Sequence, residues 1–264
     1  MSPASPPLPN HPAAGPLFKA LREAGDAILD HARQPNPSRK PDGTRVTAAD
    51  FASEAVIIAA LAAHFPQDGY LSEEGAERPA QPGGGQWYID PLDGTAAFLE
   101  GLAHCGPTLC RVRDGKVDLG AFYLPRTGTF WFAAAGGGAW RDGERLRPSD
   151  ADPGDPDGVL YLPSHAHRAG PLRWAGRTRA LGSIAAHLAQ VASGDAAAAV
   201  IPSWQIWDVG AGLLLLSEAK RQAHTLSGAP FDPMLHRQQP FLAGAPSVLA
   251  PLRHAILDLN VPSL

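Results

Sequence analysis

Apolar residues recur at three- and four-residue spacing near the start of the chain. Over residues 14–33 they form one face of a predicted amphipathic helix. Thr47 followed by Asp50 has the form of a helix cap, and it predicts a second helix from Ala48 to about His64. The intervening segment Gln34–Arg45 carries Pro, Asn, Ser, Asp and Gly, which indicate a loop.

Short β-rich runs bounded by Gly and Pro follow from Gly69 onward. Tyr70–Ser72 and Trp87–Ile89 predict strands, and Pro91 is expected to end strand pairing just after Asp90. Three more runs are separated by Asp-Gly or Thr-Gly dipeptides, which predict tight turns. These runs are Thr108–Val112, Val117–Tyr123 and Thr129–Ala134. Together they predict an antiparallel meander.

Strands and helices alternate in the C-terminal part of the chain. The predicted strands are Val159–Leu162, Ala196–Ile201 and Phe241–Ala243, and the predicted helices are Ser183–Ser193, Asp208–Ala219 and Pro246–Leu257. We therefore expect an α+β half, which contains the meander, joined to a smaller α/β half. The densest turn cluster, Ser149–Gly158, marks the boundary. This gives a floppy tail over residues 1–13, a first half over 14–150 and a second half over 151–264.

Composition narrows the class of protein. The 264 residues are 44% hydrophobic and 18% charged, which is typical of a globular chain and excludes a disordered one. A net charge of −4 without a run of Lys or Arg argues against a nucleic acid polymer as partner. The longest apolar stretches, such as Val209–Leu216, are far shorter than the roughly 20 residues that cross a bilayer, so no membrane partner is expected.

The N-terminal sequence and the cysteines predict a compartment. Residues 1–16 have neither the basic region nor the apolar region of a secretory signal. The two cysteines, Cys105 and Cys110, are too few for a disulfide framework and indicate reduced thiols. We therefore expect a cytoplasmic protein.

The sequence WYIDPLDGTAAF carries the most informative chemistry. Asp90 and Asp93 lie three residues apart at a predicted strand end, so their carboxylates can converge outside the sheet. The backbone amides of Gly94, Thr95 and Ala96 would lie at a helix start, where unpaired N–H groups favour phosphate. Carboxylates repel phosphate unless a cation lies between them, and hard oxygen ligands suit Mg²⁺. Taken alone, the same residues also suit an ordinary turn.

Two further acidic sites favour the metal. Leu71-Ser72-Glu73-Glu74 follows one predicted strand, and Trp207-Asp208 opens a helix after another. Three strand-end acids from distant segments are what a two-metal hydrolytic site requires, with the metals roughly 3.5–4 Å apart. The SEE, DPLDGT and WDVGAG motifs together resemble those of the inositol monophosphatase superfamily of Mg²⁺-dependent, lithium-sensitive phosphatases. Their order and spacing match from about residue 14 to 258.

The resemblance implies a layered α-β-α-β-α sandwich that hydrolyses a small phosphorylated metabolite. Glu73, Asp90 and the main-chain carbonyl of Leu92 would bind a first Mg²⁺. Asp90, Asp93 and Asp208 would bind a second, with Asp90 bridging the two. Homodimers are common in the family, so the resemblance suggests a homodimer.

The resemblance also assigns the residues that would handle water and charge. Thr95 would pair with an acid near Glu73 to orient and deprotonate the attacking water. Asp50 would support this nucleophile or bind an optional third Mg²⁺, or would only cap its helix. Lys40 would lie near the phosphate on a loop, or would be a solvated loop lysine.

The same resemblance places the substrate against backbone groups. The amides of Gly94, Thr95 and Ala96 would hold phosphate oxygens. Gly182 and Ser183 would line the alcohol side of the pocket. No covalent nucleophile is implied.

The positions that choose the substrate depart from the family's patterns. After DGT, inositol phosphatases continue Thr-Asn-Phe and adenosine bisphosphate nucleotidases a basic residue with Glu-Phe, whereas this chain has Ala96-Ala97-Phe98. The acidic sugar contact of inositol phosphatases is replaced by Ile201. The LSEE spelling leans towards 3′(2′),5′-bisphosphate nucleotidases, in which Trp204 would stack on a base, while RDGK and GGGAW resemble histidinol-phosphate phosphatases. We expect a broad phosphomonoesterase with inositol-monophosphate-like polyol phosphates among its substrates.

Other functional classes have weaker support. A catalytically silent regulatory homologue would be favoured by loss of a ligand, yet the acidic set is complete. A purely structural scaffold within an oligomer is the second alternative. His165 and His167 suit zinc, but no further ligand pair has suitable spacing.

Overall fold

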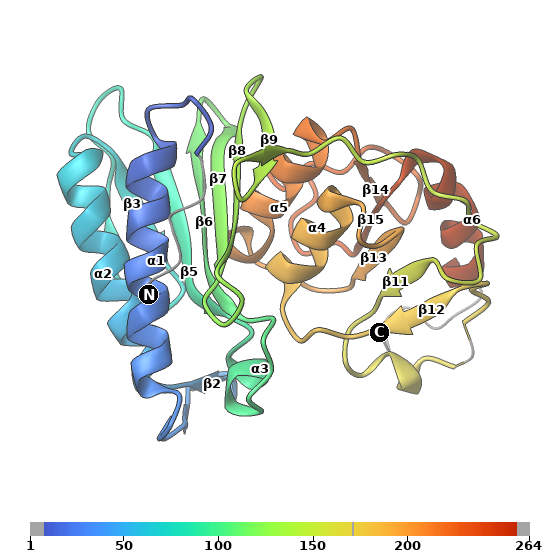
Figure 1. Ribbon diagram of the computed structural model, residues 1–264, viewed down its shortest axis with the longest axis horizontal. Coiled ribbons are helices and arrows are strands. Elements are labelled where there is room, and N and C mark those ends of the chain that lie inside the picture. Colours follow the sequence, from blue (N-terminus) through green and yellow to red (C-terminus); the bar gives the residue numbers. More distant parts are fainter. Residues whose placement is uncertain (1–7, 171, 258–264) are drawn as a thin grey trace.

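Two helices lie over one face of a large β-sheet (Figure 1). The computed structural model describes residues 8–170 and 172–257. Helix α1 spans Ala14–His31 and helix α2 spans Ala48–His64, so both predicted N-terminal helices are confirmed.

The large sheet has eight strands in the order β10-β9-β8-β7-β6-β5-β3-β4. All neighbouring pairs are antiparallel except β3 and β5, which run parallel. The strands are β3 (Gly69–Ser72), β4 (Glu77–Arg78), β5 (Gln86–Asp93), β6 (Gly106–Arg113), β7 (Lys116–Leu124), β8 (Thr129–Ala134), β9 (Gly138–Arg141) and β10 (Glu144–Arg145). The predicted meander is confirmed, and β9 and β10 extend it.

The expected end of pairing at Pro91 is wrong. Strand β5 continues to Asp93, which pairs with Gly106, and its register against β6 shifts between Asp90 and Asp93. Proline has no N–H to donate, so the ladder skips locally and then resumes. Asp90 and Asp93 are therefore held by one irregular strand and not by a strand and a following turn.

The second sheet has five strands in the order β12-β11-β13-β15-β14. The strands are β11 (Val159–Tyr161), β12 (Arg177–Arg179), β13 (Ala198–Ile201), β14 (Gln222–Thr225) and β15 (Phe241–Gly244). Strand β11 runs parallel to β12 and β13, and β15 runs antiparallel to β13 and β14. The predicted α/β alternation is confirmed, whereas β12 and β14 were not predicted because most of their residues are exposed or half-buried and give little apolar signal.

Helices fill the space between and beside the two sheets. Helix α4 (Ile184–Ser193) and helix α5 (Ile206–Glu218) lie between them, and α6 (Pro246–Leu257) covers the far face of the smaller sheet (Figure 1). With α1 and α2 on the outside of the large sheet, the layers run α-β-α-β-α, as the sequence predicts. Buried apolar clusters fill the junctions between layers, and one of them lies on both sides of the central helix layer.

Close backbone contact brings α5 onto the large sheet. A Cβ added at Gly210 would lie 2.2 Å from Sγ of Cys110, and one added at Gly120 would lie 2.8 Å from Cα of Ala211. Neither position has room for a side chain, so glycine allows α5 to pack directly on β6 and β7. This contact fixes where the first turn of α5, with Asp208, meets the sheet.

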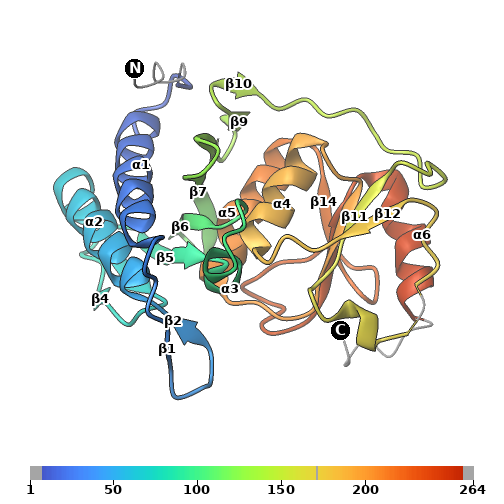
Figure 2. The ribbon, with the colours of Figure 1, turned by 60° about the horizontal axis from the view of Figure 1, so that its bottom comes forward.

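A small hairpin projects from the molecule beside the start of α2 (Figure 2), and a short helix follows β5. The predicted loop Gln34–Arg45 contains strand β1 (Ser38–Arg39), which pairs with β2 (Arg45–Val46). Helix α3 spans only Thr95–Leu99. The hairpin carries Lys40, and α3 begins at Thr95.

Three expectations concern regions outside the elements. Of the expected tail over residues 1–13, residues 1–7 lie outside the described residues, while Ala13 is buried and Leu8 packs on the cluster beneath α1. The expected boundary, Ser149–Gly158, carries no helix or strand and connects β10 to β11. Within the described residues, no helix is both long and apolar enough to span a bilayer.

Candidate active site

Three carboxylates from distant segments converge at one point. Glu73 directly follows β3, Asp90 lies in β5, and Asp208 lies in the first turn of α5. One carboxylate oxygen from each lies within 4.8 Å of the other two. Strands β3 and β5 are parallel neighbours, so the Glu73 and Asp90 positions emerge at the same sheet edge.

The convergence is electrostatically unfavourable without a cation. Burial raises the pKa of Asp90 well above its usual range, and the nearby charges of Glu73, Asp93 and Asp208 raise it further. Burial and the charge of Asp93 likewise raise the pKa of Asp208. Buried like charges are tolerated when they bind a metal, and an all-oxygen set suits a hard divalent cation such as Mg²⁺. The donor set therefore fits the ion that the sequence predicts.

Asp90 gives a stability test in the metal-free protein. The raised pKa of Asp90 means that the folded state binds this proton more tightly than the unfolded state does. The contribution of the Asp90 proton to the free energy of unfolding is therefore fully present below the unfolded pKa of about 3.9, and it is lost as the pH rises through the folded pKa. In EDTA at about pH 7.5, we expect Asp90→Asn to raise the melting temperature by at least about 2 °C, roughly the shift for 1 kcal/mol in a protein of this size.

The matched control for this test is Asp26→Asn, because Asp26 is exposed on α1. The difference between Asp90→Asn and wild type should shrink as the pH falls towards the unfolded pKa of about 3.9, because Asp90 is then mostly neutral in the folded protein. A melting temperature that Asp90→Asn leaves unchanged or lowers at pH 7.5 would contradict the repulsive cluster.

Asp93 lies beside this group and joins the two halves of the molecule. Its Oδ2 accepts hydrogen bonds from Oγ of Ser183 at 2.7 Å and from the backbone N–H of Ala185 at 2.5 Å. Burial raises the pKa of Asp93 to about 6. The Ser183 hydroxyl also accepts the N–H of Ala186 and so caps α4. Ser183 is thus engaged with Asp93 and its own helix.

Thr95 and Asp50 form a hydrogen-bonded pair across α3 and α2. The Thr95 hydroxyl lies 3.1 Å from Oδ1 of Asp50 and 3.3 Å from the carbonyl oxygen of Leu92, and it can donate to either. Oδ2 of Asp50 accepts the N–H and the hydroxyl of Thr47, which completes the predicted cap. Asp50 therefore both caps α2 and contacts Thr95, with one oxygen for each task. Burial raises its pKa, although the hydrogen bonds from Thr47 oppose this.

Lys40 reaches from the β1–β2 hairpin to the acids that follow β3. Its Nζ lies 2.8 Å from a carboxylate oxygen of Glu73 and 2.8 Å from one of Glu74. Burial would lower the pKa of Lys40, but these hydrogen bonds raise it overall, so the lysine stays charged. Burial raises the pKa of Glu74 to about 7. Lys40 is thus an ion-pair partner within the site and not a solvated loop lysine.

Two glycines shape the start of α3. Gly94 has φ +90°, and a Cβ there would lie 3.1 Å from Cβ of Cys105, from the Gly182 carbonyl oxygen and from Cβ of Ser183. Gly182 has φ +83° and faces Ala97. Both backbone conformations favour glycine, so the loop before α4 can pack directly on α3. Gly94, Thr95, Ala96, Gly182 and Ser183 therefore lie in one neighbourhood.

An open cavity of about 770 Å³ lies over the acids. Lys40, Glu73 and Asp208 line it together with residues of the β13–α5 connection. Trp204 is among the lining residues, but it is only 7% exposed and its ring packs edge-on against Phe231 and Phe241, so little of the ring is free to stack on a base.

The two cysteines and the histidines His165 and His167 do not belong to the acidic group. Cys105 and Cys110 are free thiols, as predicted. Burial raises the pKa of Cys105 to about 11 and that of Cys110 to about 12, so neither is a ready nucleophile. Among the described residues, His165 and His167 belong to no cluster of three potential metal ligands.

Some contacts of the site were not predicted from the sequence. The buried Ser53 hydroxyl donates to the carbonyl oxygen of Pro91 at 2.7 Å, and Glu74 shares Lys40 with Glu73. Ser53 lies three residues after Asp50, on the same helix face, so helical spacing offered a signal for it. No local pattern indicated that Ser183 would bind Asp93.

Comparison with known proteins decides the family. Residues 11–258 match the sequence profile described as the inositol monophosphatase family. The chain belongs to this family. The profile spans both halves and every acid described above, so the predicted resemblance is confirmed.

Family members that are similar to this chain carry names that point to different roles. Nus factor SuhB of Escherichia coli is 32% identical over 224 residues, which cover 79% of this chain and 83% of SuhB. Histidinol-phosphatase of Chlorobaculum parvum is 32% identical over 212 residues, covering 76% and 81% of the two chains. The solved IMPase of Thermotoga maritima superposes with a TM-score of 0.82 at 26% identity, covering 92% and 95%. The α-β-α-β-α fold is thus that of this family's phosphatases.

Proposed function

We propose that this protein hydrolyses small phosphomonoesters with Mg²⁺ as its cofactor. The observation that carries the proposal is the convergence of Glu73, Asp90 and Asp208 beside the Thr95–Asp50 pair. The first three residues offer oxygen ligands, and the pair offers a hydroxyl and a carboxylate to position water. Membership in a family of phosphatases supports the same reaction class.

Two Mg²⁺ ions would be held by the acids of both halves. Glu73, Asp90 and the carbonyl of Leu92 would hold the first, and Asp90, Asp93 and Asp208 the second. Asp93 already uses Oδ2 for two hydrogen bonds, which leaves Oδ1 for the metal. When bound, Mg²⁺ would stabilise charge on the phosphoryl group and acidify water. A third ion at Asp50 has less support, because both Asp50 oxygens already accept hydrogen bonds.

The chain's own groups would orient the reactants. A Thr95 hydroxyl that donates to Asp50 keeps its lone pairs for a hydrogen bond from water, and the pair with Asp50 can take up the released proton. Glu73 or its neighbour Glu74, which both bind Lys40, would be the second acid that helps to orient and deprotonate the water. The amides of Gly94, Thr95 and Ala96 would hold phosphate oxygens, which places the phosphorus next to the acids. Lys40 would offset negative charge as the phosphate enters.

We infer broad substrate use that includes inositol-monophosphate-like polyol phosphates. Ile201 offers no acid to a sugar hydroxyl, and Ala96 and Ala97 add no charge near α3. The identity to a Nus factor and to a histidinol-phosphatase is nearly equal, so it selects no single substrate. Gly182 and Ser183 would approach the alcohol portion from the start of α4.

A panel of phosphomonoesters tests this proposal. With Mg²⁺ present, we expect inositol 1-phosphate and glycerol 2-phosphate to be hydrolysed with kcat/KM values within about 100-fold of each other, because few specific hydrogen bonds grip the leaving group. Phosphate release is the readout. A preference of a hundredfold or more for adenosine 3′,5′-bisphosphate or histidinol phosphate would replace the broad reading with that narrower activity.

A regulatory role is the second candidate, because one relative is the Nus factor SuhB. A catalytically silent regulator would release no phosphate from any member of the panel while still binding a protein partner. Gel filtration of the purified chain would test the expected homodimer separately.

A further inference from the structure

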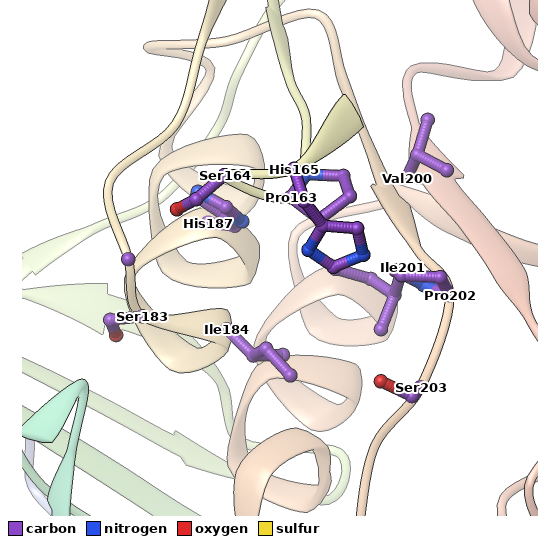
Figure 3. A pocket seen from close by; sticks show the side chains of 11 residues that line it. Pro163, Ser164, His165, Ser183, Ile184, His187, Val200, Ile201, Pro202 and Ser203 are labelled. Atoms are coloured by element: carbon purple, nitrogen blue, oxygen red, sulfur yellow. The ribbon is translucent and has the colours of Figure 1, made fainter. Parts of the chain in front are cut away.

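A second pocket opens beside the acidic cavity, between the start of α4, the end of β13 and the loop after β11 (Figure 3). Its volume is about 230 Å³. The two cavities share Ile184 and Ser203 as lining residues, so they are adjacent. A substrate whose phosphate lies over the acids would extend its alcohol portion into this pocket.

The pocket wall is mainly apolar. Figure 3 shows Ile184, Ile201 and the His165 ring around the same opening. Five apolar side chains contribute to the wall, namely Pro163, Ile184, Val200, Ile201 and Pro202. Asp, Glu, Lys and Arg do not occur among the described residues that line it. A polyol or an ammonium group would therefore find no charged partner here.

Ser183 is fully engaged in hydrogen bonds, and His187 uses one of its two ring nitrogens. Ser183 donates to Asp93 and accepts from Ala186. Nε2 of His187 accepts the backbone N–H of Leu181 at 3.0 Å, and its ring stacks on Tyr161 at 4.8 Å. Burial lowers the pKa of His187 to about 4, so this imidazole is neutral at physiological pH.

The remaining polar side chains are exposed, and the His165 ring borders the opening (Figure 3). Ser164, His165 and Ser203 are exposed residues of the lining. Hydroxyls of a substrate near these residues can keep contact with water. Hydroxyls directed at Ile184 and Ile201 would lose water without gaining a partner, and each such loss weakens binding.

We propose that this pocket selects phosphomonoesters whose alcohol portion is a compact apolar group, such as one saturated or aromatic ring or a branched alkyl chain. The inference rests on the proposed phosphatase activity and adds the class of leaving group. The size is suitable, because a cavity of roughly 150 Å³ lined by aliphatic residues holds benzene. Ile201 and Ile184 are the residues that determine this specificity.

Two substrates with the same ring test the inference. Cyclohexyl phosphate and inositol 1-phosphate share a six-carbon ring and differ only in the ring hydroxyls. With wild-type protein and Mg²⁺, we expect kcat/KM for cyclohexyl phosphate to exceed that for inositol 1-phosphate by at least about tenfold, since apolar pockets reject one added hydroxyl by roughly 10²-fold and some hydroxyls here face water. A ratio of one or less would overturn the inference.

The two phosphate esters can also differ in their intrinsic chemical reactivity. This difference is the same for every enzyme variant, so a change in the ratio between variants of Ile201 reports the pocket alone. Ile201→Glu should lower the cyclohexyl-to-inositol ratio by about tenfold or more, because a carboxylate accepts hydrogen bonds from ring hydroxyls. Ile201→Gln has a similar shape without the charge and should lower the ratio less. A folded Ile201→Glu protein with an unchanged ratio would overturn the role of Ile201.

Ile201 is buried, so its variants can fail to fold, and a second position is needed to test the inference. Ile184 is half-buried at the first position of α4, and Ile184→Thr keeps its branched shape while adding one hydroxyl. This variant should also lower the ratio, and an unchanged ratio in the folded variant would contradict the inference. If wild type hydrolyses neither phosphate, nor glycerol 2-phosphate, then the proposed phosphatase activity itself fails. If it hydrolyses all three but prefers inositol 1-phosphate, only the leaving-group inference fails.

Discussion

Thr95→Ala is expected to lower kcat by about 10²–10⁴-fold, the usual range for a group that positions and deprotonates a reactant. The Thr95 hydroxyl contacts Asp50, and alanine has no hydroxyl to make this contact. Thr95 is not one of the proposed side-chain metal ligands, so the Mg²⁺ concentration for half-maximal activity should change little. Steady-state kinetics over a Mg²⁺ series separates these two quantities.

Thr95→Ser is the matched control for this variant. Serine keeps the hydroxyl and loses only a methyl group, so we expect it to recover most of the lost kcat. The Thr47 cap of α2 is untouched in both variants, and circular dichroism should report the same helix content. An alanine variant within about twofold of wild type would remove Thr95 from the mechanism.

Asp93→Asn is expected to lower kcat/KM by more than about 100-fold. Mutation of a residue that only hydrogen-bonds to a metal ligand typically lowers activity by about 10–100-fold, so a larger loss indicates a direct ligand. Asparagine removes the negative charge but keeps one acceptor oxygen for Ser183 and Ala185. The two halves should therefore stay joined, and the melting temperature of the Mg²⁺-free protein should not fall.

Asp93→Ala separates the charge from the hydrogen bonds. It removes both, so it should lose activity and also destabilise the protein, since the buried Ser183 hydroxyl and the Ala185 N–H are left without their acceptor. If Asp93→Asn unfolds as readily as Asp93→Ala, its loss of activity would reflect structure and not metal binding.

Local signals explain what the sequence predicted well. Helix α2 was predicted with its observed bounds because the Thr47–Asp50 cap and Pro66 mark its two ends. The meander followed from β-rich runs separated by turn dipeptides, and Asp114 and Asp142 do adopt positive φ in those turns. The acidic group of Glu73, Asp90 and Asp208 was predicted from strand-end positions together with the family resemblance.

Features that depend on distant partners could not be predicted from the sequence. The course of β5 past Pro91 depends on Gly106 of the neighbouring strand, which a local reading of proline ignores. The bond from Ser183 to Asp93 joins residues 90 positions apart. The burial of Trp204 depends on Phe231 and Phe241, which follow it in the chain but carry no pattern that pairs them with it.

Phosphate release from glycerol 2-phosphate by EDTA-treated, dialysed protein measures the requirement for a cation most directly. We expect no turnover before Mg²⁺ is added and full recovery as it is titrated in, because in the described part of the chain Lys40 is the one side-chain cation that forms an ion pair with these acids. Asp93→Asn, treated in parallel, should stay far below wild type at every Mg²⁺ concentration. Full activity of the chelated wild-type protein would contradict the metal-dependent mechanism.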